Sequence, residues 1–90
     1  MVKEKGSPSG SGQETLSEER ELILHNDDVN TFDFVIDALI EVCSHEPLQA
    51  EQVALIAHYK GKCGALSGDY YKLKPPCEEM TRRGLSVTIE

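Results

Sequence analysis

Two polar sites hold the side chains of this 90-residue chain that could do chemistry. The first is Asn26-Asp27-Asp28, which places two carboxylates next to each other, and the second is His58. Paired carboxylates suggest general acid–base catalysis, but adjacent residues in a turn seldom face one another. The sequence contains no nucleophile with an adjacent base and no phosphate-binding loop. These residues therefore indicate an acidic binding domain, and we expect a protein that is not an enzyme.

The cysteines and histidines do not form a metal-binding pattern. Cys43, Cys63 and Cys77 are odd in number and widely spaced, which is a poor basis for a disulfide framework. Neither a Cys-x-x-Cys nor a His-x-x-x-His pair exists in the chain. We expect no metal and no cofactor.

Charge and composition limit the kinds of partner and the number of domains. A net charge of −7 argues against binding to nucleic acid or to an anionic membrane, and it suits a cationic ligand or plain solubility. Residues 1–20 are rich in Gly and Ser and cannot bury enough apolar surface to fold, so we predict a flexible tail followed by one domain at 21–90. No signal peptide or membrane span is apparent. We expect a soluble, cytoplasmic monomer.

The domain begins with a predicted strand and helix that position the acidic turn. Residues 21–25 form an apolar run typical of a strand, and Asn26-Asp27-Asp28 ends it because these side chains favour turns. Asn30 or Thr31 can cap the helix that follows. The apolar residues of this helix recur at helical spacing and are Phe32, Val35, Ile36, Leu39, Ile40, Val42 and Cys43.

A second helix should carry His58. Pro47 is a typical first helical residue, the helix runs to about Tyr59, and Gly61 is suited to close it. The residues that share one side of this helix are Leu48, Gln52, Leu55, Ile56 and Tyr59.

The remaining segments complete an α+β fold. Residues 62–66 and 85–89 predict strands, and a third helix starts after the turn at 67–69. Pro75-Pro76 either kinks that helix or divides it, because proline removes a backbone hydrogen bond. The predicted order is β-α-α-β-α-β, a three-stranded antiparallel sheet with helices on one face.

Three motifs together resemble the ClpS family: 24–28 (Leu-His-Asn-Asp-Asp), the helix at Phe34-Val35, and 58–64 (His-Tyr-Lys-Gly-Lys-Cys-Gly). ClpS proteins are adaptors of the bacterial ClpA or ClpC unfoldases and recognise N-degrons, that is, destabilising N-terminal residues. The resemblance spans Glu21 to Glu90. It implies the ClpS-like fold, which is similar to the C-terminal domain of a ribosomal stalk protein and has the order of elements given above.

The resemblance also implies roles for individual residues. In ClpS-like proteins the positions matching Asn26, Asp28 and His58 surround the α-ammonium group of the substrate, and the position matching Asp27 lies beside them. The positions matching Phe32, Val35, Ala54, Ala57 and Leu85 form an apolar pocket for a first residue that is Phe, Tyr, Trp or Leu. The positions matching Asp69 and Lys74 touch the N-terminal domain of the Clp AAA+ unfoldase, toward whose pore the tail would reach. The substrate is then delivered for proteolysis.

Some residues depart from the family pattern. Residues 30–32 are Asn-Thr-Phe where the family commonly has Thr-Pro-Met, and Ala54 stands where a bulky methionine usually borders the pocket. We therefore expect a pocket that tolerates a broader set of first residues, unless Phe32 fills the freed space. Two alternatives are a regulator of the unfoldase that has lost N-degron binding, and the related domain of eukaryotic N-degron ubiquitin ligases, for which a chain of this length lacks the ligase machinery.

Overall fold

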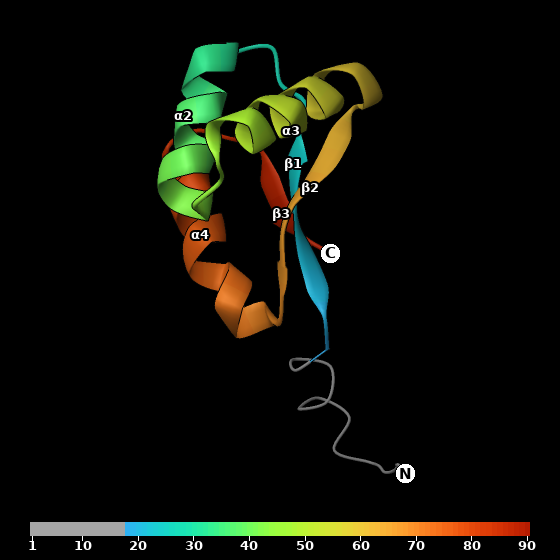
Figure 1. Ribbon diagram of the computed structural model, residues 1–90. Helices are drawn as coiled ribbons and strands as arrows, with labels where there is room; N and C mark the ends of the chain where they lie inside the picture. The colour runs from blue at the N-terminus through green and yellow to red at the C-terminus, as the bar shows by residue number, and fades with distance from the viewer. Residues whose placement is uncertain (1–17) are drawn as a thin grey trace, which may run out of the picture.

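A computed structural model describes residues 18–90 of the chain. Residues 1–17 of the predicted tail lie outside the described residues, and its last residue, Arg20, begins the first strand. The elements in chain order are β1 (Arg20–His25), α2 (Phe32–Cys43), α3 (Pro47–Lys60), β2 (Lys62–Gly68), α4 (Tyr70–Arg82) and β3 (Val87–Ile89). They form a three-stranded antiparallel sheet with three helices on one face, which confirms the predicted α+β fold (Figure 1).

The sheet has β1 at its centre, in the order β2-β1-β3. Leu22 pairs with Leu66 and Ile23 with Gly64, so Ala65 is the extra residue of a bulge in β2. β2 is longer than predicted and β3 is shorter. β3 starts late because Leu85 donates its N–H to the Met80 carbonyl, at 3.0 Å, where it closes the end of α4.

Helix α2 begins after Thr31, one of the two caps that the sequence offers. The Thr31 hydroxyl accepts a hydrogen bond from the Phe34 N–H at 3.1 Å. Its most deeply buried residues are Ala38, Leu39 and Cys43, whereas Phe32, predicted to be part of the apolar stripe, is 41% exposed. The first turn of α2 therefore projects from the core. Burial raises the pKa of the Cys43 thiol to about 11, which keeps it protonated.

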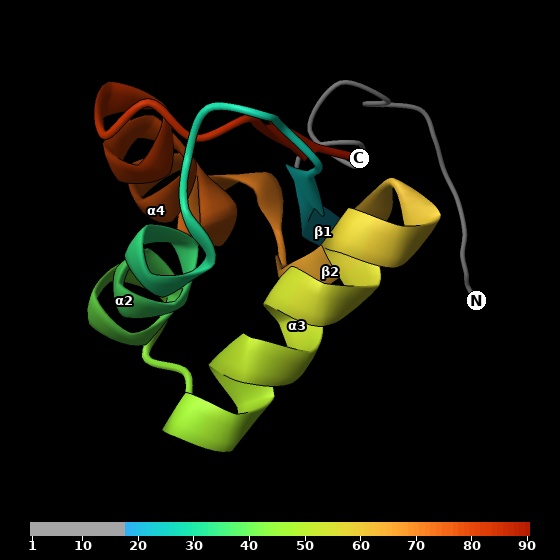
Figure 2. The ribbon, with the colours of Figure 1, turned by 90° about the horizontal axis from the view of Figure 1, so that it is seen from above.

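Helix α3 turns a different side to the core from the one that the sequence indicates. Gly61 closes the helix in the left-handed conformation at φ 97°, as predicted. The predicted apolar side faces solvent, however, with Leu48 66% and Tyr59 79% exposed. The buried side is made of small residues, namely Ala50, Val53, Ala54 and Ala57. Small side chains let α3 approach the sheet and α2 closely, and Figure 2 shows α2 and α3 side by side with α4 beyond α2.

Helix α4 runs through Pro75 and Pro76 without being divided. Neither proline has an N–H to donate, so the carbonyls of Tyr71 and Lys72, four residues earlier, lose their helical partners. Both of these residues are exposed, where water can satisfy the carbonyls. The helix still buries Leu73 and Met80 on either side of the prolines.

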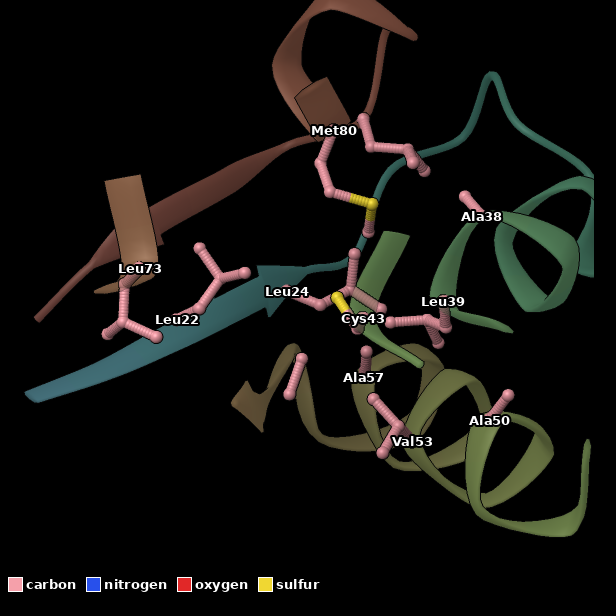
Figure 3. Close-up of a cluster of buried hydrophobic side chains, with 12 residues drawn as sticks. Leu22, Leu24, Ala38, Leu39, Cys43, Ala50, Val53, Ala57, Leu73 and Met80 are labelled. Carbon is pink, nitrogen blue, oxygen red and sulfur yellow. The ribbon is translucent and has the colours of Figure 1, made fainter. Parts of the chain in front are cut away.

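The core lies between the sheet and the three helices (Figure 3). Its largest fully buried side chains are Leu22, Leu24, Leu39, Leu73 and Met80. A polar link joins the loop between α2 and α3 to the bulge: the buried His45 Nε2 lies 2.6 Å from the Ala65 carbonyl oxygen. The carbonyl of a bulge residue is free of the strand ladder, so this contact satisfies it.

A matched pair of leucine variants tests which sides of helices α2 and α3 face the core. Leu39→Ala removes a side chain that is fully buried and should lower the free energy of unfolding by about 3 kcal/mol. Leu48→Ala makes the same change on the solvent side of α3 and should cost no more than about 0.5 kcal/mol. Urea unfolding of the two variants gives both values, and equal losses would contradict the observed orientation of α3.

Candidate functional site

A cavity of about 50 Å³ opens where the end of β1, the acidic turn, the start of α2 and the second half of α3 meet. Its lining combines apolar side chains with a polar rim. The lining residues are Leu24, His25, Asn26, Asp27, Phe32, Val35, Ala54, Ala57 and His58.

The carboxylate of Asp27 holds the turn in shape. One of its oxygens accepts hydrogen bonds from the N–H groups of Val29 at 3.0 Å and Asn30 at 2.8 Å. The other accepts from the Asn30 side-chain amide at 3.1 Å, and that amide also donates to the Gly84 carbonyl at 3.0 Å. Partial burial raises the pKa of Asp27, but the hydrogen bonds from Asn30 and Val29 outweigh it and leave the pKa below its usual value.

The polar rim is formed by Asn26 and His58. The N–H of Asn26 donates to the Gly61 carbonyl at 2.9 Å, and this bond fixes the turn against the end of α3, where His58 lies. Within residues 18–90, neither the Asn26 amide nor the His58 ring forms a side-chain hydrogen bond. The rim therefore offers a carbonyl oxygen and ring nitrogens to a ligand.

The apolar wall comes from both helices and from the strand. Ala54 and Ala57 are buried on the inner side of α3, and Leu24 is buried in β1. Val35 and Phe32 complete the wall from α2. The rings of Phe32 and His58 lie 5.4 Å apart at an angle of 54°, so Phe32 also borders the polar rim.

The structure brings most of the predicted site residues together around this cavity and leaves two of them outside. Asp28 is exposed and does not line the cavity, and Leu85 is buried in the core and does not line it either. The structure adds Leu24 and His25, which the sequence analysis did not assign to the site. Their position directly before the acidic turn was the available signal, because the end of a strand lies beside the turn that follows it.

The two residues predicted to touch an unfoldase lie at the opposite end of the fold. Gly68, which precedes Asp69, pairs with Arg20 at one end of β1, whereas the cavity lies at His25 at the other end (Figure 1). Asp69 caps α4 by accepting a hydrogen bond from the Lys72 N–H at 2.8 Å. The Lys74 ammonium lies 3.9 Å from the Glu78 carboxylate.

Two kinds of feature are missing from the described part of the chain. No group of three or more His, Cys, Asp or Glu residues within 18–90 is placed to hold a metal ion. None of the helices in this range is both long and apolar enough to cross a membrane.

Comparison with known proteins identifies relatives for this arrangement. Residues 17–88 match the family model described as "ClpS: ATP-dependent Clp protease adaptor protein ClpS". The ATP-dependent Clp protease adapter protein ClpS of Nitratidesulfovibrio vulgaris is 38% identical over 55 residues, which are 59% of this chain and 55% of that protein. The ClpS of Vibrio atlanticus is 40% identical over 55 residues, 59% of this chain and 52% of that protein. The match thus spans about half the length of these curated relatives.

A solved structure shares the fold. It is Agrobacterium tumefaciens ClpS2 bound to L-phenylalaninamide, with a TM-score of 0.70 over 82% of this chain and 96% of that chain. The two sequences are 22% identical in this comparison, so the likeness concerns the fold.

The lowered pKa of Asp27 predicts how stability depends on pH. A carboxyl whose folded pKa lies below its unfolded value, about 3.9, stabilises the fold above that value and loses this effect as the pH falls through the folded pKa. Asp27→Asn should therefore be less stable than wild type at neutral pH, and the difference should shrink below a pH of about 4. Urea unfolding of both proteins, from neutral pH to below a pH of about 4, measures this difference in stability.

Asp28→Asn is the control, because its exposed carboxylate has no partner within residues 18–90. The same pH-dependent loss in both variants would show that the turn's hydrogen bonds are not its cause.

Proposed function

Because the chain belongs to the ClpS family of ATP-dependent Clp protease adaptor proteins, we propose that it binds the free N-terminal residue of substrate proteins and delivers them to a Clp unfoldase for degradation. One observation carries this proposal. The cavity places two polar side chains that have no side-chain hydrogen-bond partner within residues 18–90, Asn26 and His58, directly beside an apolar wall. An N-terminal residue has the matching parts, an α-ammonium group and a side chain. Binding and release of this kind need no catalytic group and no cofactor.

The polar rim would receive the α-ammonium group. This group donates three hydrogen bonds, and the Asn26 carbonyl oxygen and a neutral His58 nitrogen can accept two of them. The negative charge comes from Asp27 at the cavity edge and from Asp28 beyond it. Because both oxygens of Asp27 accept hydrogen bonds inside the turn, Asp27 would act mainly by fixing Asn26 and by its charge.

The apolar wall would contact the side chain of the substrate's first residue. The volume of the cavity limits which side chains fit. The cavity of about 50 Å³ is far smaller than the apolar cavity of about 150 Å³ that admits benzene in an engineered protein. Phe32 and Ala54 both line the cavity, so the Phe32 ring would take up part of the space that a small residue at position 54 leaves. An aliphatic first residue, such as Leu, would enter with less rearrangement than Phe, Tyr or Trp.

Contact with the unfoldase would involve the start of α4. We place the N-terminal domain of a ClpA- or ClpC-type unfoldase there, against Asp69, Lys74 and the exposed Tyr71. Because this surface and the cavity lie at opposite ends of β1, one molecule could hold substrate and unfoldase together. The adaptor would act as a monomer in the cytoplasm.

The first test of the proposal is whether binding requires a free α-amino group. Acetylating a Leu-initiated peptide removes the charge and two donors, which should weaken binding at least about tenfold because acceptors that the bound peptide covers stay unpaired. Calorimetry with matched free and acetylated peptides measures the ratio. His58→Ala and Asn26→Ala should weaken binding of the free peptide and reduce the ratio.

Gln52→Ala is the control, since Gln52 is exposed on α3 and does not line the cavity. Equal affinities for the free and acetylated peptides in wild type would contradict the proposal, and would favour a regulator that does not bind N-degrons.

The second test concerns the size of the cavity. Phe32→Ala should enlarge it and raise the affinity for Phe- and Trp-initiated peptides relative to Leu, by about 1–3 kcal/mol. Ala54→Met should narrow it and weaken binding of Ile- and Val-initiated peptides most, because their branched side chains are widest at the entrance. Titration of the five peptides against the three proteins measures these changes. Identical preferences in wild type and Phe32→Ala would show that Phe32 does not limit the cavity.

A further inference from the structure

A second hollow lies next to the cavity and is larger, with a volume of about 200 Å³. We call it the α2–α3 groove. It is lined by Phe32, Asp33 and Ile36 of α2 and by Glu51 and Leu55 of α3. Phe32 lines both hollows and forms the wall between them.

The groove combines an apolar floor with two unpaired carboxylates. Asp33 and Glu51 stand on opposite helices, are exposed, and have no hydrogen-bond or ion-pair partner within residues 18–90. Ile36 and Leu55 add apolar surface to the lining of the same groove. Lys and Arg side chains match such a groove, because their aliphatic stems cover apolar surface while their charged ends remain near carboxylates and water.

The groove lies within reach of a peptide whose first residue occupies the cavity. The cavity is bordered on α3 by Ala54, Ala57 and His58, and the groove by Glu51 and Leu55, whose mean position is about three residues earlier. A helix rises 1.5 Å per residue, so the two sets are about 5 Å apart along α3. An extended peptide advances about 3.3 Å per residue. A peptide that runs from the cavity toward the start of α3 would therefore place its second or third residue over the groove.

We propose that the α2–α3 groove binds a basic side chain at the second or third position of the substrate. This inference rests on the proposed function, because it takes the N-terminal residue to lie in the cavity. The substrate class would then be defined by two features, an apolar first residue and a Lys or Arg immediately after it.

Peptides that differ by a single charge test this. Leu-initiated peptides carry Arg, citrulline or Glu at position two or at position three and are otherwise identical. Citrulline keeps the shape of Arg without its charge. In wild type, at low salt, Arg should bind about fivefold more tightly than citrulline at one of the two positions, and Glu more weakly than both. Added salt should reduce the ratio.

Two double variants with the same change of net charge locate the effect. Asp33→Asn/Glu51→Gln should bring the ratio of Arg to citrulline affinity close to one. Asp37→Asn/Glu78→Gln alters exposed carboxylates outside both hollows and should keep the wild-type ratio. An equal drop of this ratio in both double variants would attribute the preference for Arg to overall charge, and it would overturn the groove proposal.

The remaining outcomes separate this inference from the proposed function. If acetylation weakens binding but Arg and citrulline bind equally at both positions, the groove proposal fails and the proposed function stands. If no Leu-initiated peptide binds, both fail.

A second copy of the chain is the alternative occupant of the groove. Sedimentation experiments test this occupant. If the chain dimerises, Leu55→Glu abolishes the dimer and a bound Arg peptide leaves the dimer unchanged, the groove is a dimer interface and the proposal is overturned.

Discussion

The hydrogen bonds of the Asp27 carboxylate are the constraint on which the site depends. They close the turn after β1 onto Asn30, whose amide reaches the Gly84 carbonyl in the segment after α4. Through Asn30, the Asp27 carboxylate thus links the turn between β1 and α2 to the segment between α4 and β3, and it sets where α2 begins. The position of Phe32, the first residue of α2, follows from this, and so does the wall between the cavity and the groove.

Helix α3 supplies the space that the turn encloses. Its inner side is made largely of alanines, so the helix packs close to the sheet and still leaves a hollow at Ala54 and Ala57. Its longer side chains point away from the core, and one of them, Leu55, becomes the floor of the groove instead. The same choice of residues therefore shapes the packing of the helix and both hollows beside it.

Local signals in the sequence were sufficient for the order of elements and for several of their ends. The Thr31 cap and the Gly61 end of α3 follow from backbone chemistry that acts over a few residues. The orientation of α3 did not follow, because the larger apolar residues, such as Leu48, share one side of the helix while close packing places the alanines against the core. Asp28 and Leu85 do not line the cavity, and spacing along the chain does not reveal this because it depends on contacts across the fold.

The exposed position of Asp28 has a kinetic consequence. A carboxylate that makes no contact in the cavity adds little to the lifetime of a complex, but its field extends about 8 Å into physiological salt. For a cationic ligand such a charge speeds diffusional encounter, and the net charge of −7 acts in the same direction. Under the proposed function, Asp28 would influence how often a positively charged chain end arrives at the turn, while the groups inside the cavity would determine how long it stays.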